Sequence, residues 1–134
     1  MTHQFTVSTR ARAQLVEITE QVASAVRESG AASGVVHVFV PHTTAGITIN
    51  ENADPAVGAD LLAALERMAP DGARYSHGEG NSPAHVKASL MGCCQTVLFQ
   101  DRALVLGAWQ GIYLCEFDGP RTRRVAVNIH ADAG

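Results

Sequence analysis

The chain has 134 residues, a length that fits one domain with a core of its own. Its hydrophobic fraction of 46% is typical of globular proteins and excludes the disordered and fibrous classes. A net charge of −3, from ten basic and thirteen acidic residues, argues against a nucleic-acid binder, because neutralising phosphates needs a basic surface.

The cysteines and the hydropathy pattern bear on the compartment. Cys93, Cys94 and Cys115 form no Cys-x-x-Cys pair and are odd in number, so they fit neither a disulfide framework nor a zinc ribbon. We expect three reduced thiols. No apolar run is long enough to cross a bilayer, and the N-terminus lacks the pattern of a signal peptide. These features predict a cytoplasmic protein with no membrane partner.

The N-terminal half is predicted to contain four strands and two helices. The alternating residues Gln4–Thr9 and the apolar piece Leu15–Ile18 predict strands, and Thr19 is a candidate N-cap for a helix ending at Gly30. Two further strands and the second helix follow, at Val35–Val40, Gly46–Asn50 and from Asp54-Pro55 to Pro70.

One histidine falls inside a predicted strand. His37 lies in the β-branched run between Gly34 and Pro41. A histidine in a strand interior is more often a hydrogen-bonded core residue than a ligand, so we interpret His37 as structural.

The C-terminal half is predicted to be mostly strand. A short helix follows Pro83 and ends at Gly92. Strands outnumber helices and are joined by hairpin-length connections, so we expect a single α+β domain, 1–134, with a mainly antiparallel sheet or sandwich and two to three helices. The last four strands are expected at Thr96–Phe99, Leu104–Leu106, Gly111–Phe117 and Val125–Ile129.

The strand Gly111–Phe117 is apolar on both faces. Both faces need cover, and a chain with few helices offers little of it. We therefore expect a homo-oligomer, in which a second copy covers the exposed face.

The segment Tyr75–Lys87 holds ligand and acid–base side chains in a region that cannot be regular structure. Gly78, Gly80 and Pro83 prevent a helix or central strand from running through it. Polar loops on a rigid scaffold often carry binding or catalytic residues. The alternative is a solvated surface loop whose glycines only serve turns.

Three histidines from separate elements, His42, His77 and His85, would form an open zinc-type site if they converge. The expected cofactor is a divalent ion, Zn²⁺ or Mg²⁺. Alternatively, one histidine is a general acid or base and the others bind an anion, or each has a surface or capping role. Candidate partners for the ligand rings are Glu79, Asn81 and Glu51.

Residues for a phosphorylated substrate are also present. Thr43 and Thr44 offer hydroxyl and backbone N–H groups, and cations are offered by Lys87, Arg121, Arg123 and Arg124. Trp109 could stack on a ligand ring. The alternatives are turn-forming threonines, a solvated charge run and a Trp in the core or an interface.

Six motifs, in order and over nearly the whole chain, resemble the YjbQ family. They are His42–Gly46, Asn50–Pro55, Tyr75–Lys87, Leu90–Gly92, Leu106–Gly111 and Glu116–Arg123. The resemblance implies a compact α+β domain that assembles into a homotrimer and carries the name secondary thiamine-phosphate synthase. This sequence departs from those of its relatives at Cys93 and Cys94, where small residues such as Ser are usual. We interpret that difference as packing variation.

The resemblance also implies a shared polar pocket between subunits. Some relatives carry a metal ion on the histidines. The metal ligands would then be His42, His77 and His85. The catalytic residues would be Glu79, Asn81, Glu51 and Asp118. The substrate would be bound by Thr43, Thr44, Lys87, Trp109, Gln110 and Arg121.

Three functions follow as hypotheses. The first is transfer of a pyrimidinylmethyl group from its diphosphate to a thiazole phosphate, with Lys87, Arg121 and a histidine-bound metal holding the leaving group. The second is another metal-dependent activity, such as hydrolysis with Glu79 as base. The third is a non-catalytic trimer that binds a small anion or metal.

Overall fold

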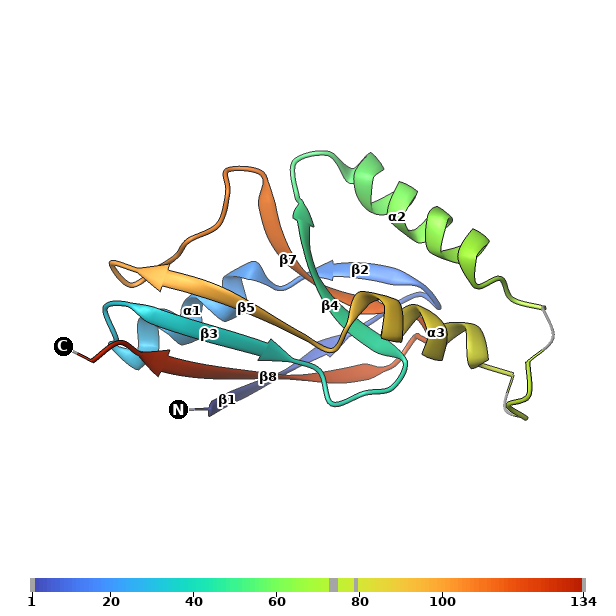
Figure 1. Ribbon diagram of the computed structural model, residues 1–134, viewed down its shortest axis with the longest axis horizontal. Coiled ribbons are helices and arrows are strands. Elements are labelled where there is room, and N and C mark those ends of the chain that lie inside the picture. The colour runs from blue at the N-terminus through green and yellow to red at the C-terminus, as the bar shows by residue number, and fades with distance from the viewer. Residues whose placement is uncertain (1, 73–74, 79, 134) are drawn as a thin grey trace.

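The structure, a computed structural model, describes residues 2–72, 75–78 and 80–133. This part of the chain forms one α+β domain of eight strands and three helices (Figure 1). Its elements are β1 Thr2–Ser8, β2 Gln14–Glu17, α1 Thr19–Ser29, β3 Gly34–Phe39, β4 Ala45–Glu51, α2 Pro55–Met68, α3 Ser82–Met91, β5 Cys94–Gln100, β6 Ala103–Leu104, β7 Gln110–Glu116 and β8 Thr122–Ala131.

The strands form two antiparallel sheets. The larger has the order β1-β8-β3-β5-β6, and the smaller has the order β2-β7-β4. All strand pairs in the described residues are antiparallel, as the hairpin-length connections predicted. Among the described helices, none is long and apolar enough to cross a membrane.

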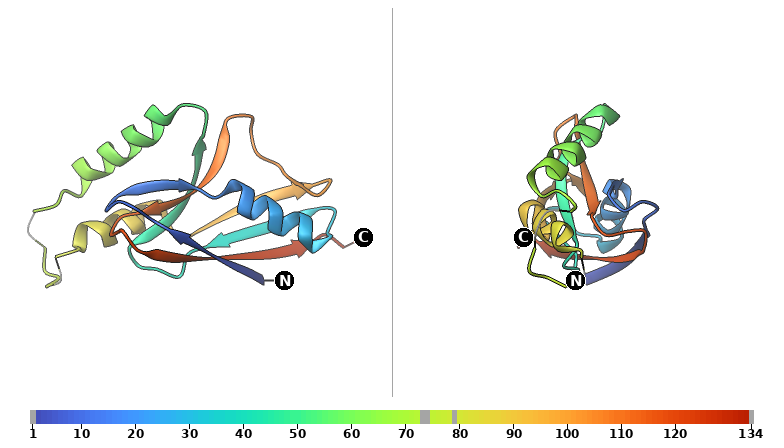
Figure 2. Two further views of the ribbon diagram at one scale, coloured as in Figure 1. Left: turned by 180° about the vertical axis from the view of Figure 1, so that it is seen from behind. Right: turned by 90° about the vertical axis from the view of Figure 1, so that its right-hand side faces the viewer.

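The main core lies where the inner faces of both sheets meet α1 (Figure 2). Alternate residues of β3 point into this core, so Val36 and Val38 are buried while their neighbours are partly or fully exposed. Ile47 and Leu114 enter the core from the smaller sheet. Each such buried side chain contributes about 1.5–3 kcal/mol by leaving water. This core fixes the strands whose ends carry the polar residues.

One end of the outer face of the smaller sheet is covered by α2 and α3. A second apolar cluster joins Leu65 of α2 and Ala84 and Ala88 of α3 to Cys115 and Phe117. The expectation that β7 lacks cover within its own chain is therefore wrong for its Cys115 end, which two helices cover, whereas Tyr113 faces a cavity. The argument for an oligomer from this strand alone is lost.

Several predicted boundaries are confirmed by the backbone. Asp54 caps α2 by accepting a hydrogen bond from the N–H of Ala56 at 2.9 Å, and Gly30 ends α1 in the left-handed conformation with φ of 75°. Asp101 and Arg102 both have positive φ, 51° and 65°, as a two-residue hairpin between antiparallel strands requires.

Three predictions needed correction. Helix α1 begins at Thr19 rather than after it, and the Thr19 hydroxyl instead accepts the N–H of Ile112 at 2.8 Å. The strand expected at Leu104–Leu106 is the two-residue β6. His37 does hydrogen-bond, to Thr96 Oγ1 at 2.9 Å, but it is half-buried on the outer face of the larger sheet, outside the core.

Gly46 allows β4 to pass close to the end of α3. A Cβ atom there would lie 2.8 Å from the carbonyl oxygen of Gly92 and 3.0 Å from Cβ of Met91. The same contact includes a hydrogen bond from the N–H of Ile47 to Gly92 O at 3.0 Å. A side chain at this position would push the strand and the helix apart.

We therefore expect Gly46→Ala to lower the free energy of unfolding by about 1–3 kcal/mol, as overpacking a rigid contact does. Urea denaturation measures it. Gly78→Ala is the matched control, because a Cβ there meets nothing within 4 Å. Equal stability of the two variants would contradict the tight packing of β4 on α3.

Candidate functional site

The connection from β3 to β4 carries the first predicted site residues. Val40 is buried, and its N–H donates to Cys93 O at 2.9 Å, which anchors the start of the connection to the end of α3. His42 is half-buried, Thr43 is exposed and Thr44 is buried again. The connection is therefore held at both ends, with His42 and Thr43 between them.

A buried ion pair holds the far end of this connection. Arg123 of β8 and Glu116 of β7 are 2% and 0% exposed, and Arg123 Nε donates to Glu116 Oε2 at 2.8 Å. Arg123 also donates to the hydroxyl of Thr44 at 2.8 Å, and Glu116 accepts the hydroxyl of Thr9 at 2.9 Å. Glu116 was not predicted as a site residue, and Arg123, predicted as a cation for a phosphorylated substrate, is instead buried in this pair.

The tautomer of His42 follows from its hydrogen bond. Its Nε2 lies 2.9 Å from the backbone nitrogen of Arg124, and a backbone N–H can only donate. Nε2 is therefore the acceptor, and the proton of the neutral ring sits on Nδ1. Burial, and after it the positive charges of Arg123 and Arg124, lowers the pKa of His42 below its usual 6.5.

His42 shares a cavity of about 470 Å³ with His85 of α3. Thr43, Ser89 and Cys93 add polar atoms to its wall. The ring of His85 also meets that of His77 edge to face, with 5.4 Å between ring centroids. The described structure thus brings the three predicted histidines into one neighbourhood, with His85 in the middle.

A second polar cluster joins the start of α3 to the turn after β7. Asn81 Nδ2 donates to Asp118 Oδ2 at 3.0 Å, and Arg121 donates to the same oxygen at 3.1 Å. The other side-chain atom of Asn81, Oδ1, is buried without a hydrogen-bond partner among the described residues. Asp118 therefore contacts two other predicted site residues, and Oδ1 of Asn81 is left with acceptor capacity.

Lys87 has a structural partner. It is buried, 6% exposed, and its ammonium group pairs with the carboxylate of Glu66 on α2. The hydrogen bond from Lys87 is the main reason that the pKa of Glu66 lies below its usual value. In this arrangement Lys87 ties α3 to α2, and its role in binding substrate stays a prediction.

The remaining predicted residues lie at the opposite end of the β4–β7 pair. Ala45 faces Glu116 at one end of this ladder, whereas Glu51 faces Gln110 at the other. Six residues of strand separate the two ends by roughly 20 Å. Trp109 is 64% exposed beside Gln110, and its carbonyl accepts the N–H of Asn52 at 2.8 Å.

The proposed metal set is incomplete in the visible structure. No group of three or more His, Cys, Asp or Glu is placed to hold an ion within residues 2–72, 75–78 and 80–133. Glu79, predicted as a catalytic residue, lies outside the described residues. Ser89 and Cys93, which line the histidine cavity, were not predicted, because nothing in their local sequence distinguishes them from other residues near a helix end.

The sequence matches the family described as UPF0047 protein YjbQ-like over residues 3–132. The chain belongs to this family. The UPF0047 protein of Methanocaldococcus jannaschii is 48% identical over 98% of this chain and 96% of the relative. YugU of Bacillus subtilis is 46% identical over 92% of this chain and 94% of the relative.

Solved structures of YjbQ-like proteins share the fold. A Clostridium acetobutylicum protein of the family superposes with a TM-score of 0.94 at 52% identity, covering 96% of this chain and 99% of that protein. A Sulfolobus solfataricus protein, described as YbjQ-like and of unknown function, reaches 0.95 at 32% identity, covering 98% and 97%. The family resemblance read from the motifs is thus confirmed.

The first prediction from the site concerns the buried ion pair. Burial acts to raise the pKa of Glu116, but hydrogen bonds from Arg123, the Asp118 N–H and Thr9 outweigh it, so the pKa lies below its usual value. Removing one partner of a buried pair costs about 3–5 kcal/mol. We expect that loss from Glu116→Gln in urea denaturation at pH 7.

The acid dependence should change with it. A lowered carboxyl pKa stabilises the fold fully above its unfolded value of about 4.3, and this contribution is lost as the pH falls through the folded value. In Glu116→Gln, the free energy of unfolding should therefore fall less steeply as the pH is lowered through this range. Glu20→Gln, which breaks an exposed pair with Arg27, should cost less than about 1 kcal/mol. Equal costs for the two variants would contradict the role of the buried pair.

The second prediction concerns His42. In NMR titrations of ¹³C-labelled histidine, its midpoint should lie below 6.5, since burial and neighbouring arginines disfavour the imidazolium. Arg124→Gln removes a positive charge but keeps the backbone N–H, so it should raise the midpoint. Arg102→Gln serves as the control. A midpoint that does not respond to Arg124→Gln would rule out the electrostatic cause.

Proposed function

We propose that this YjbQ-like protein is a homotrimeric enzyme that binds small phosphorylated molecules at the cavity shared by His42 and His85. The reaction that we assign to it is of the thiamine-phosphate synthase type. A pyrimidinylmethyl group leaves its diphosphate, as the C–O bond breaks, and forms a C–N bond to a thiazole phosphate. This proposal rests on the family resemblance for the reaction and on the geometry around His42 for the binding.

The observation that carries the binding proposal is the hydrogen bond at His42 Nε2. With Nε2 engaged, the polar atom that His42 can offer a ligand is the Nδ1–H donor. The arginine charges that depress its pKa also make its surroundings attractive to an anion. A neutral donor in a positive neighbourhood favours an oxyanion over a bare cation as the ligand next to His42.

Other groups at the cavity fit a phosphate. The hydroxyls of Thr43 and Ser89 can donate to phosphate oxygens. Arg121 follows the same turn that carries Asp118, and its side chain is half exposed. Its guanidinium can pair with a second phosphate group. Diphosphate departure leaves positive charge on the migrating carbon, which the carboxylates of Asp118 and of a neighbouring subunit's Glu51 would stabilise.

A divalent ion fits best on the other side of His85. Two imidazoles that share one Zn²⁺ have ring centroids about 5 Å apart, given N–metal distances near 2 Å. The 5.4 Å between His77 and His85 agrees with this spacing. A bound Zn²⁺ or Mg²⁺ would neutralise diphosphate oxygens. His42 would join as a third ligand only by giving up its hydrogen bond from Arg124.

A trimer would bring the Glu51 end of the β4–β7 pair in one subunit to the histidine end of the next subunit. Glu51, Trp109 and Gln110 are roughly 20 Å from the histidine end within one chain, too far to share a small ligand with it. In a cyclic head-to-tail assembly, one end of each subunit meets the other end of the next. The exposed apolar side chains of Trp109 and Leu90, 64% and 52% exposed, suit such a contact.

The test combines binding and turnover with purified protein. Diphosphate should bind in calorimetry, and product should form from the two phosphorylated substrates. His42→Ala and His85→Ala should each weaken diphosphate binding about 10- to 100-fold, the cost of one hydrogen bond to a charged group. A chelator should reduce turnover while leaving the fold intact by circular dichroism.

His130→Ala is the control, since His130 lies on the outer face of the larger sheet, away from the cavity. An equal loss in this variant would contradict the site. Diphosphate binding without turnover would contradict the reaction and leave an anion-binding protein. Full turnover by a species that sediments as a monomer would contradict the shared pocket.

A further inference from the structure

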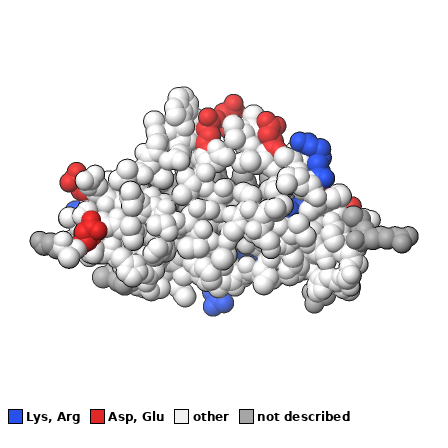
Figure 3. Space-filling view, viewed as in Figure 1, with Lys and Arg blue, Asp and Glu red and all other residues white. Residues whose placement is uncertain are grey.

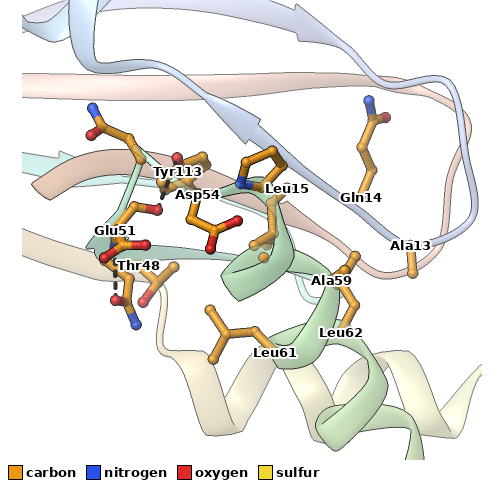
Figure 4. Close-up of a pocket in the computed structure, with 14 residues that line it drawn as sticks. Ala13, Gln14, Leu15, Thr48, Glu51, Asp54, Ala59, Leu61, Leu62 and Tyr113 are labelled. Carbon is orange, nitrogen blue, oxygen red and sulfur yellow. Dashed lines mark hydrogen bonds between the residues drawn. The ribbon is translucent and has the colours of Figure 1, made fainter. Parts of the chain in front are cut away.

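A second cavity, of about 420 Å³, lies between α2 and the outer face of the smaller sheet (Figure 4). It shares no lining residue with the histidine cavity. Its floor is β2, β4 and β7, and its roof is the first half of α2. The volume falls within the range of small-molecule sites, roughly 300–1,000 Å³.

One end of this cavity is polar and acidic. Figure 4 shows Thr48, Glu51, Asp54 and Tyr113 gathered there. The Asp54 carboxylate caps α2, whereas the Glu51 carboxylate accepts no hydrogen bond from the described residues. The cavity lining contains two acids, Glu51 and Asp54, and no Lys, Arg or His. Asp and Glu also colour the surface where β4 ends and α2 begins (Figure 3).

Tyr113 also lies at the acidic end of the cavity, and its pKa responds to burial there and to nearby carboxylates. Its hydroxyl donates to the carbonyl oxygen of Glu51 at 3.3 Å. Burial, and after it the negative charges of Glu17 and Glu51, raises the pKa of Tyr113 above its usual 10. The hydroxyl therefore stays protonated at neutral pH, and the surrounding potential is negative.

The other end of the cavity is mainly apolar, with Gln14 as an exception. Leu61 and Leu62 reach in from α2, and Leu15 lies on β2. All three remain partly exposed, and Leu65 is the only buried residue of α2 among those described. Helix α2 thus stands off the sheet and leaves apolar surface open to water, which costs stability unless something fills the gap.

We propose that this cavity binds a small organic cation, with an ammonium or protonated ring nitrogen at Glu51 and an apolar ring between Leu15, Leu61 and Leu62. Charge complementarity selects the cation, because two carboxylates face the site with no basic side chain to balance them. The Tyr113 hydroxyl oxygen and the Thr48 hydroxyl accept further N–H groups. The reaction proposed above also uses Glu51, but binding of a cation here requires neither turnover nor the histidine cavity, which shares no lining residue with this one.

The experiment uses three test ligands of one shape and different charge: benzylammonium, benzyl alcohol and benzoate. Binding to the full chain in its native assembly is followed by protein-observed NMR at pH 7. Benzylammonium should bind with a Kd of order millimolar, as its size permits, and about tenfold more tightly than benzyl alcohol. Benzoate should not bind.

Matched variants separate the acid at the cavity from surface charge. Glu51→Gln should abolish the preference for benzylammonium over benzyl alcohol. Asp60→Asn removes an equal charge from an exposed position of α2 outside the cavity and should leave the preference unchanged. A similar loss in both variants would overturn the assignment to Glu51.

A second pair of variants fills the cavity. A Cβ at Gly58 would meet only Leu15 Cδ1, at 3.4 Å, so an alanine fits there in ordinary van der Waals contact. Gly58→Ala and Gly58→Leu should weaken benzylammonium binding in that order while raising the melting temperature, because Gly is a poor helix former. Binding that survives Gly58→Leu, or the absence of binding by any of the three ligands to the wild type, would overturn the proposal.

Discussion

The buried pair of Glu116 and Arg123 is the interaction on which the histidine end of the molecule depends. Two charges without water are stable only when each remaining donor and acceptor is satisfied. Thr9, Thr44 and the backbone of Asp118 supply those partners. The pair therefore fixes three chain segments at once: the end of β1, the connection that carries His42, and the turn that carries Asp118 and Arg121.

This arrangement explains how a loop-borne histidine acquires a defined chemical state. Arg123 immobilises Thr44, and the neighbouring Arg124 donates its backbone N–H to His42. The same strand thus sets both the position and the tautomer of the ring. Its two arginines also lower the pKa of His42. A group that must stay neutral and keep one N–H directed to a ligand benefits from each of these effects.

Most elements could be predicted from local sequence, because their signals are local. Asp54-Pro55 start a helix by capping and by a fixed φ, and Asp101-Arg102 close a hairpin. The burial of Arg123 could not be read this way, since it depends on Glu116 and Thr44, which are remote in sequence or on another strand. Lys87 was assigned to substrate for the same reason: its partner Glu66 lies on a different helix.

The placement of α2 shows a similar conflict between local and global preferences. Its apolar residues predict a helix face packed on the sheet, yet Leu61 and Leu62 are only partly buried. The Lys87–Glu66 pair and Leu65 hold the C-terminal half of the helix against α3 and β7, while the N-terminal half leads away from the end of β4. Gly58 faces the gap where a larger residue would fit. A sequence selected for stability alone would fill this space, and departures from that rule tend to occur where a protein binds something.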